Sequence, residues 1–278
     1  LEEHEDELSK AKSKSEALRT LKKIERRKEE KVVAENLEKS LQNDGNERLK
    51  RSLTNAYIVK DFFEGVVDVT DRVATFIEID PPYAIALDKI KRGVERNTSP
   101  GIENYNEISS EDYQDFLDNL FKECYRVLAP NGWMVCWYGV QWYHVILASM
   151  EDAGFQVCDL PAIWTKTDHQ GQTRNPEFRL GNVYEPFFYA RKDKSAIIRQ
   201  AGRTNQFNFK SLHPDHKVHP TERPIEMMEE VIKTFSVPGG HIMVPFLGSG
   251  NTLLAASNLG NTCFGYDLSE EYKNAYLK

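Results

Sequence analysis

The sequence predicts an α/β fold: a doubly wound, Rossmann-like mixed sheet with one antiparallel strand, preceded by an N-terminal helical extension. From Tyr57 to the C-terminus, short apolar runs alternate with amphipathic segments, a pattern typical of strands joined by helices. Residues 2–39 contain no Gly or Pro and are rich in charged residues, Ala and Leu, which indicates long helix. With 40% hydrophobic residues among 278, the chain can build one large core and still carry an appendage.

Each element is predicted from an apolar run and the turn signals beside it. The β-branched and aromatic run at 73–79, for example, is typical of a buried strand. We expect strands at 57–59, 73–79, 133–138, 162–165, 184–189, 241–245 and 262–266, and helices at 111–128, 142–153, 224–235 and 253–259. Ala129-Pro130-Asn131-Gly132 is expected to form a turn, and Gly154 to close a helix.

The N-terminal segment is expected to be a helical extension or linker over residues 1–50, followed by the main domain over 51–278. Asn43-Asp44-Gly45-Asn46 predicts a break in its helix. Because the chain starts with Leu1 rather than Met, we expect a piece of a longer protein. An alternative is a helix pair that forms a homodimer or touches DNA, although glutamates interleave with its cations. Those cations are Lys22, Lys23, Arg26, Arg27 and Lys28.

Charge, cysteine usage and hydropathy exclude several classes of protein. The formal net charge is −7, so a polyanionic partner must meet a locally basic groove. The four cysteines form no CxxC pair, and we find no His cluster at metal-ligand spacing, although His213, His216 and His219 lie close together, so we expect reduced thiols and no metal. No signal peptide or membrane-length apolar run is found, and a cytoplasmic location is expected.

The tetrapeptide Asp80-Pro81-Pro82-Tyr83 follows the expected strand at 73–79 directly. Two prolines restrict the backbone between an acidic and an aromatic side chain. An acceptor and a flat ring fixed at the end of a strand suit chemistry on a planar base. The sequence therefore predicts a catalytic site here, whereas the tetrapeptide alone could equally be a rigid surface turn.

A second signal, Phe246-Leu247-Gly248-Ser249-Gly250, lies between an expected strand and helix. Its glycines allow the backbone to pass close to a ligand. Asp267 ends the next strand, where a carboxylate can hold the hydroxyls of a ribose. The pattern is not GxGxxG and has no phosphate-loop lysine. It therefore favours S-adenosyl-L-methionine over dinucleotides and nucleoside triphosphates.

Together, these motifs resemble the amino-methyltransferases, which methylate an exocyclic nitrogen of a base. The catalytic motif precedes the cofactor motif, as in the permuted β group of DNA methyltransferases, common in bacteria and phages. Residues 219–226 also resemble that group's segment before its cofactor loop, and Lys60-Asp61 more loosely resembles its strand tip near the cofactor's adenine. The resemblance runs from Tyr57 to the C-terminus, and a motif of the form at Asp80 is associated mainly with adenine N6.

The resemblance implies an S-adenosyl-L-methionine-dependent DNA adenine-N6 methyltransferase in a bacterial cell or phage-infected host. It implies catalytic roles for Asp80, Pro81, Pro82 and Tyr83. It implies cofactor contacts by Lys60, Asp61, Asp80, Thr221, Phe246, Leu247, Gly248, Ser249, Gly250, Asn251, Thr252, Asp267 and Leu268.

The implied reaction is direct methyl transfer to a base that has been flipped out of the duplex. Asp80 and the carbonyl of Pro81 would accept the two N–H bonds of the adenine amino group, and Tyr83 would stack on the base. Extruding the base costs about a few kcal/mol. Positioning supplies most of the rate, and no metal is needed.

Two positions depart from the family pattern. Val244 stands where an acid usually helps to hold the cofactor's amino group, and valine cannot accept a hydrogen bond. Cofactor affinity is then lower, or another residue takes over. Arg223 stands where lysine is frequent.

The expected DNA contacts come from polar, cationic segments. They are Lys89, Lys91, Arg92, Arg96, Lys166, Arg174 and Arg203. The interval 191–218 is too short for an independent recognition domain, so we expect a short recognition sequence or relaxed specificity, with phosphate contacts dominating affinity.

Three alternative functions stay open. Cytosine-N4 methylation would use the same fold, although serine in place of Asp80 would favour it. A DNA-binding or scaffold protein with a weakened methyltransferase fold is suggested by Val244 and the long helix. An RNA methyltransferase is disfavoured by the permuted motif order.

Overall fold

The structure, a computed structural model, describes residues 44–82, 108–168, 176–212, 217, 219 and 222–277, with the backbone alone for 44–48. The chain divides into two compact units, Leu1–Ser52 and Leu53–Lys278. The sheet belongs to the second unit. The helix expected at 2–39 lies outside the described residues.

Helix α3 (Asp44–Ala56) begins within the segment that was expected to break a helix. Asp44, Gly45 and Asn46 form its first turn, so the predicted break is wrong for these three residues. Short polar side chains disfavour a helix interior, but they suit a helix start, where N–H groups lack partners. The short polar residues and glycine at 44–46 therefore mark the start of a helix.

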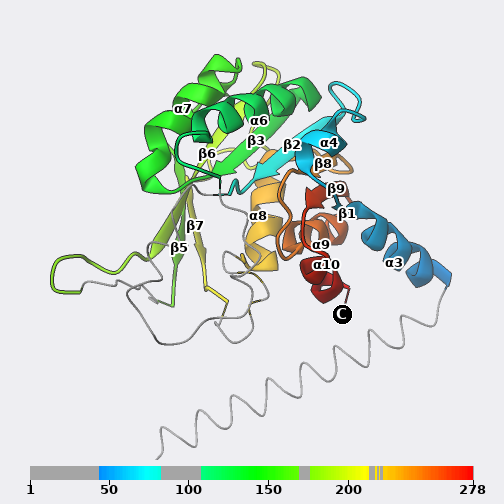
Figure 1. The fold of residues 1–278 in the computed structure, drawn as a ribbon. Helices are drawn as coiled ribbons and strands as arrows, with labels where there is room; N and C mark the ends of the chain where they lie inside the picture. Colours follow the sequence, from blue (N-terminus) through cyan, green and yellow to red (C-terminus); the bar gives the residue numbers. More distant parts are fainter. Residues whose placement is uncertain are drawn as a thin grey trace, which may run out of the picture. The chain divides into compact units, whose positions relative to one another are not determined.

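Within the described part of the chain, nine strands form one sheet in the order β1-β9-β8-β2-β3-β6-β5-β7, with β4 beside β6 (Figure 1). Strand β6 pairs antiparallel with β3, β4 and β5, and the other pairings are parallel. One described strand therefore runs against the rest, which confirms the predicted mixed sheet. The strands are β1 (Tyr57–Val59), β2 (Ala74–Ile79), β3 (Leu128–Trp137), β4 (Gln156–Val157), β5 (Ala162–Lys166), β6 (Tyr184–Arg191), β7 (Gln206–Phe209), β8 (His241–Val244) and β9 (Thr262–Asp267).

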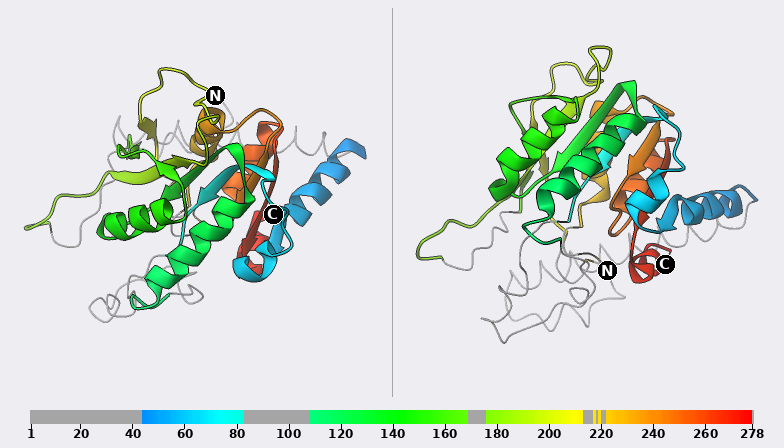
Figure 2. Two further views of the ribbon diagram at one scale, coloured as in Figure 1. Left: turned by 90° about the horizontal axis from the view of Figure 1, so that it is seen from above. Right: turned by 45° about the horizontal axis from the view of Figure 1, so that its top comes forward.

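Helices cover both faces of the sheet (Figures 1 and 2). One core packs α4 (Phe62–Val66), α6 (Tyr113–Val127) and α7 (Tyr143–Asp152) against side chains such as Ile77 and Met134. The opposite core packs α8 (Ile225–Phe235), α9 (Asn251–Asn258) and α10 (Glu270–Tyr276) against Phe76 and Val135. A short 3-10 helix, η2 (Val140–Trp142), precedes α7. Among the described helices, none is long and apolar enough to cross a membrane.

Strands β2 and β8 lie side by side where the chain order reverses. From β2 the chain continues through α6 to β3 on one side, and from β8 through α9 to β9 on the other. A crevice forms at such a switch point because the loops after the two strands leave in opposite directions. The candidate motifs at Asp80 and Gly248 follow these two strands.

The segment Ala129-Pro130-Asn131-Gly132 does not form a separate turn between helix and strand. It belongs to β3, where the pairing with β2 shifts from Ala74↔Leu128 to Phe76↔Trp133. Pro130 and Asn131 are exposed there. The breaker residues therefore mark an irregularity inside a strand, since ladder pairing exists on both sides of them.

The described elements that were not predicted include β4, β7, α4, η2 and α10. Strand β4 has only two residues, and β7 (Gln206–Phe209) alternates polar and apolar side chains inside a polar segment. Helix α10 starts at the capping residue Ser269, whose side chain accepts from the backbone N–H of Tyr272. Elements this short depend on tertiary pairing more than on local pattern.

We predict that Gly265→Ala is more destabilising than an alanine at a glycine of unusual backbone conformation. Gly265 pairs with Val244 across β9 and β8, and a Cβ there would lie 2.3 Å from the carbonyl oxygen of Val244. Separating the strands should cost roughly 3 kcal/mol. Gly239 has a φ of +68° with nothing within 4 Å of a built Cβ, so Gly239→Ala should cost about 1 kcal/mol. Denaturant unfolding measures both, and equal losses would contradict the crowding argument.

Candidate active site

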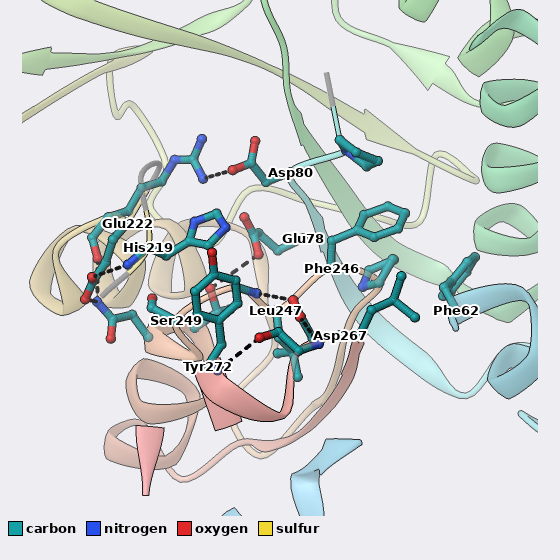
Figure 3. A pocket seen from close by; sticks show the side chains of 18 of the residues that line it. Phe62, Glu78, Asp80, His219, Glu222, Phe246, Leu247, Ser249, Asp267 and Tyr272 are labelled. Carbon is teal, nitrogen blue, oxygen red and sulfur yellow. Dashed lines mark hydrogen bonds and ion pairs between the residues drawn. The ribbon is translucent and has the colours of Figure 1, made fainter. Parts of the chain in front are cut away.

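A cleft of about 560 Å³ opens beyond the carboxyl ends of β1, β2, β8 and β9 (Figure 3). Its volume suits a small-molecule cofactor. The predicted residues that line it are Lys60, Asp80, Pro82, Phe246, Leu247, Gly248, Ser249, Asn251, Thr252, Asp267 and Leu268. The fold therefore brings the two separate motifs into one cleft.

The glycine turn between β8 and α9 forms one wall of this cleft. Gly248 and Gly250 have φ values of +53° and +79°, in the left-handed region that favours glycine. The hydroxyl of Tyr57 donates to the carbonyl of Gly248 at 2.7 Å, so a side chain from β1 holds the turn in place. A Cβ on Gly248 would lie 3.3 Å from the ring of His219, so glycine also allows the segment before α8 to approach.

Asp267 ends β9 and anchors the same turn. Its Oδ2 accepts from the N–H of Gly248 at 2.8 Å, and its Oδ1 accepts from the N–H of Ser269 at 2.9 Å. Burial raises the pKa of Asp267, while these hydrogen bonds act in the opposite direction. Each carboxylate oxygen has a second lone pair, so this anchoring leaves Asp267 able to accept further hydrogen bonds, as the predicted contact with ribose hydroxyls requires.

The strand tip after β1 contributes to the cleft differently from the prediction. Lys60 lines the cleft, and its N–H donates to the carbonyl of Asp267 at 3.0 Å. Asp61 does not line it, because its side chain caps α4 by accepting from the N–H of Phe63 at 2.8 Å. Phe62 lines the cleft instead and packs its ring 5.9 Å from that of Phe246.

Asp80 follows β2, and its carboxylate forms a buried ion pair. The Arg223 guanidinium lies 2.8 Å from Oδ2 of Asp80 and 3.3 Å from Glu185. It also stacks 3.9 Å above the ring of Trp137 and is 7% exposed. A planar guanidinium can bridge two carboxylates and stack at once, which an ammonium cannot do. Arginine at this position therefore fixes the orientation of the predicted catalytic acid.

Glu78 lies two residues before Asp80 and was missed by the sequence analysis. The indole N–H of Trp137 donates to its Oε1 at 2.9 Å, and the hydroxyl of Thr252 donates to its Oε2 at 3.3 Å. Burial raises the pKa of Glu78 to about 7, Arg223 opposes the shift, and Asp80 adds to it. The sequence did indicate Glu78, because it is an acid inside the apolar run at 73–79. Carboxylates are seldom fully buried unless they have a partner.

The segment before α8 closes another side of the cleft through contacts that were not predicted. Asn251 donates to Oε1 of Glu222 at 3.0 Å and to the carbonyl of Arg223 at 2.8 Å. The ring of His219 meets that of Tyr272 at 4.8 Å, and burial lowers the pKa of His219. Asn251 thus ties the start of α9 to the arginine that holds Asp80. In the described residues, no group of three or more His, Cys, Asp or Glu could hold a metal ion.

Several predicted site residues lie outside the cleft or outside the described residues. Pro81 is buried and Gly250 caps α9, and neither lines the cleft. The structure does not describe Tyr83, Lys89, Lys91, Arg92, Arg96, Arg174 and Thr221.

Lys166 and Arg203, both predicted to contact DNA, each have an acidic and an aromatic neighbour. Lys166 lies 2.9 Å from Glu185 and over the ring of Trp164. Arg203 lies 3.5 Å from Glu230 and stacks 3.9 Å above Phe207. DNA contact by either cation stays a prediction.

Solved structures with a similar fold identify the fold of this chain. The M1.HpyAVI–SAM complex has a TM-score of 0.59 at 23% identity, covering 79% of this chain and 96% of that one. PvuII DNA methyltransferase, described as cytosine-N4-specific, has a TM-score of 0.62 at 15% identity, covering 79% of this chain and 84% of that one. The fold is that of a DNA methyltransferase.

A protein-family model described as DNA methylase, of the N6 and N4 type, matches residues 74–278, and the chain belongs to this family. "Putative methylase YubD" of Escherichia coli (strain K12) is 28% identical over 200 residues, covering 72% of this chain and 78% of the relative. "Type II methyltransferase M.HpaI" of Haemophilus parainfluenzae is 25% identical over 235 residues, covering 77% and 70%. Membership confirms S-adenosyl-L-methionine as the cofactor and DNA as the substrate.

We predict that wild-type stability falls relative to Glu78→Gln as the pH rises. The pKa of Glu78 is raised from 4.5 to about 7, so the folded state holds this proton more tightly than the unfolded state. The stabilisation is fully present below pH 4.5 and is lost as the pH rises through about 7. The difference in unfolding free energy between the two proteins should change by roughly 3 kcal/mol from about pH 5 to about pH 8. Urea unfolding across this range measures it, and a pH-independent difference would contradict the assigned pKa.

Proposed function

We propose that this protein transfers a methyl group from S-adenosyl-L-methionine to N6 of adenine in DNA. The observation that carries the proposal is the position of Asp80. It lies at the carboxyl end of β2 and lines the same cleft as the glycine turn after β8. An acceptor for the target amino group and the cofactor loop thus share one site.

Two features support the cofactor's position in this cleft. The left-handed Gly248 brings backbone close to the ligand space, and the carboxylate of Asp267 retains lone pairs for ribose hydroxyls. Phe62 and Phe246 provide apolar surface for the adenine ring beside them. When bound, S-adenosyl-L-methionine supplies an electrophilic methyl group.

In the proposed mechanism, Asp80 accepts one N–H of the flipped adenine and the carbonyl of Pro81 accepts the other. Arg223 holds the Asp80 carboxylate by an ion pair of 2.8 Å, so the acceptor is oriented before the base arrives. This preorganisation matters because the amino lone pair is delocalised into the ring and must be redirected. Stacking of the base on Tyr83 completes the proposed site.

The same fold serves cytosine-N4 enzymes, so specificity rests on the motif at Asp80. The resemblance associates Asp-Pro-Pro-Tyr mainly with adenine, and serine in place of Asp80 would favour cytosine. A weakened, DNA-binding protein remains the alternative from a different class, because β8 carries Val244 where an acid is usual. A measurement of S-adenosyl-L-methionine binding distinguishes the two functions, because an enzyme must bind the cofactor and a protein with a weakened fold would not.

The proposed organisation is a helical extension over residues 1–50 and a catalytic domain over 51–278. A homodimer formed through the extension stays a prediction, because residues 1–43 lie outside the described part of the chain. The curated relatives are bacterial, which supports a place in the cytoplasm of a bacterial cell or phage-infected host.

We predict that a duplex incubated with the protein and S-adenosyl-L-methionine yields N6-methyladenine when it is digested to nucleosides. Asp80→Ala should lower the rate by at least about a thousandfold and largely spare cofactor binding. Asp152→Ala is the matched control, because Asp152 is exposed on α7 outside the cleft, so its replacement should keep most activity. N4-methylcytosine as the product would overturn the adenine assignment, and turnover by Asp80→Ala would overturn the mechanism.

We also predict a short or degenerate target sequence. The interval after β6 contributes β7 to the sheet, paired with β5 over 206–209, so few residues remain there for a recognition domain. Phosphate contacts should then dominate affinity and make it strongly dependent on salt. Sequencing of methylated sites tests this, and a long, strict motif would contradict it.

A further inference from the structure

Glu78 presents a buried carboxyl group to the floor of the cleft, beside the glycine turn. It is 3% exposed, and Figure 3 shows it between Asp80 and Leu247. Ile77 pairs with Met243 across β2 and β8, so the next position along both strands sets Glu78 beside Val244. At this pair of neighbouring positions, β2 carries an acid, Glu78, and β8 carries an apolar residue, Val244.

The hydrogen bonds to Glu78 stabilise its carboxylate without neutralising it. Both come from neutral donors, the indole of Trp137 and the hydroxyl of Thr252. Burial raises the pKa of Glu78 to about 7, although Arg223 acts in the opposite direction. A buried carboxylate of this kind gains most from a cationic ligand group that donates hydrogen bonds.

The other acids that line the cleft are engaged or exposed. Asp80 is ion-paired with Arg223, and Asp267 accepts from two backbone N–H groups of the glycine turn and α10. Glu222 accepts from Asn251 and from the N–H of His219. Glu270 and Glu271 are exposed on α10. Among the described acids of the cleft, Glu78 is buried, accepts from two neutral side-chain donors and has no role yet in the proposed function.

We propose that Glu78 binds the α-ammonium group of S-adenosyl-L-methionine, replacing an acid from β8 at the level of Val244. The cofactor has two cationic centres, a sulfonium and an ammonium. The ammonium carries N–H donors that match a carboxylate, whereas the sulfonium must leave its methyl group directed at the target nitrogen near Asp80. This assignment rests on the proposed function, because it uses the same cleft.

Calorimetry with two ligands tests the assignment. One ligand is S-adenosylhomocysteine, and the other is its analogue in which hydrogen replaces the α-amino group. The wild-type protein should bind S-adenosylhomocysteine at least about tenfold more tightly than the analogue. Glu78→Gln should bring this ratio close to one, chiefly by weakening S-adenosylhomocysteine.

Glu229→Gln is the matched control for a change of the same type outside the cleft. Glu229 lies on α8, accepts from Asn258 and pairs with Lys233, so its replacement should keep the wild-type ratio. An unchanged ratio in Glu78→Gln, or an equal loss of affinity for both ligands, assigns Glu78 a packing role and overturns the inference. Failure of the wild-type protein to bind S-adenosylhomocysteine overturns the proposed function and this inference with it.

Discussion

The parallel pairing of β2, β8 and β9 is the constraint on which the site depends. These neighbouring strands end at the same edge of the sheet, so Asp80, the glycine turn and Asp267 meet although they are far apart in sequence. The turn is then fixed from two sides, by Tyr57 through Gly248 and by Asp267. A parallel sheet thus converts the order of motifs along the chain into one cleft.

Charged side chains around Trp137 orient the acids that the sheet brings to the cleft. Arg223 enters from the segment before α8, pairs with Asp80 and stacks on Trp137. The same indole donates to Glu78, so one tryptophan contacts both Glu78 and the arginine that holds Asp80. Because burying charges is costly, this cluster contributes more to the orientation of the acids than to stability. That balance suits a site whose rate depends on positioning.

The sequence predicted the sheet and its helices well wherever apolar runs were long. Residues 74–79 and 241–244 form strands as expected, because most of their side chains are buried between two helical layers. Breaker residues were harder to interpret. Gly132 lies in a strand irregularity and Asp44 starts a helix, since the same residue types favour bulges, helix starts and turns. Strand β7 forms only because β5 offers its edge.

The site was predictable where a motif carries the chemistry and not where tertiary contacts create it. Asp80 and Gly248 could be named as candidates from their two motifs, the order of these motifs along the chain and the family resemblance that they carry. The roles of Glu78 and Arg223 depend on Trp137 and Glu185, which come from other strands, and no sequence spacing encodes these meetings. The ion pair of Lys166 with Glu185 is a further contact that the polar segment around Lys166 did not indicate.

The most direct test is a crystal structure of the protein with S-adenosylhomocysteine. We predict that the adenosine lies between the glycine turn and Asp267, with the sulfur atom facing Asp80. A ligand bound outside this cleft, or one whose sulfur faces away from Asp80, would contradict the claim that the two motifs form a single methyl-transfer site.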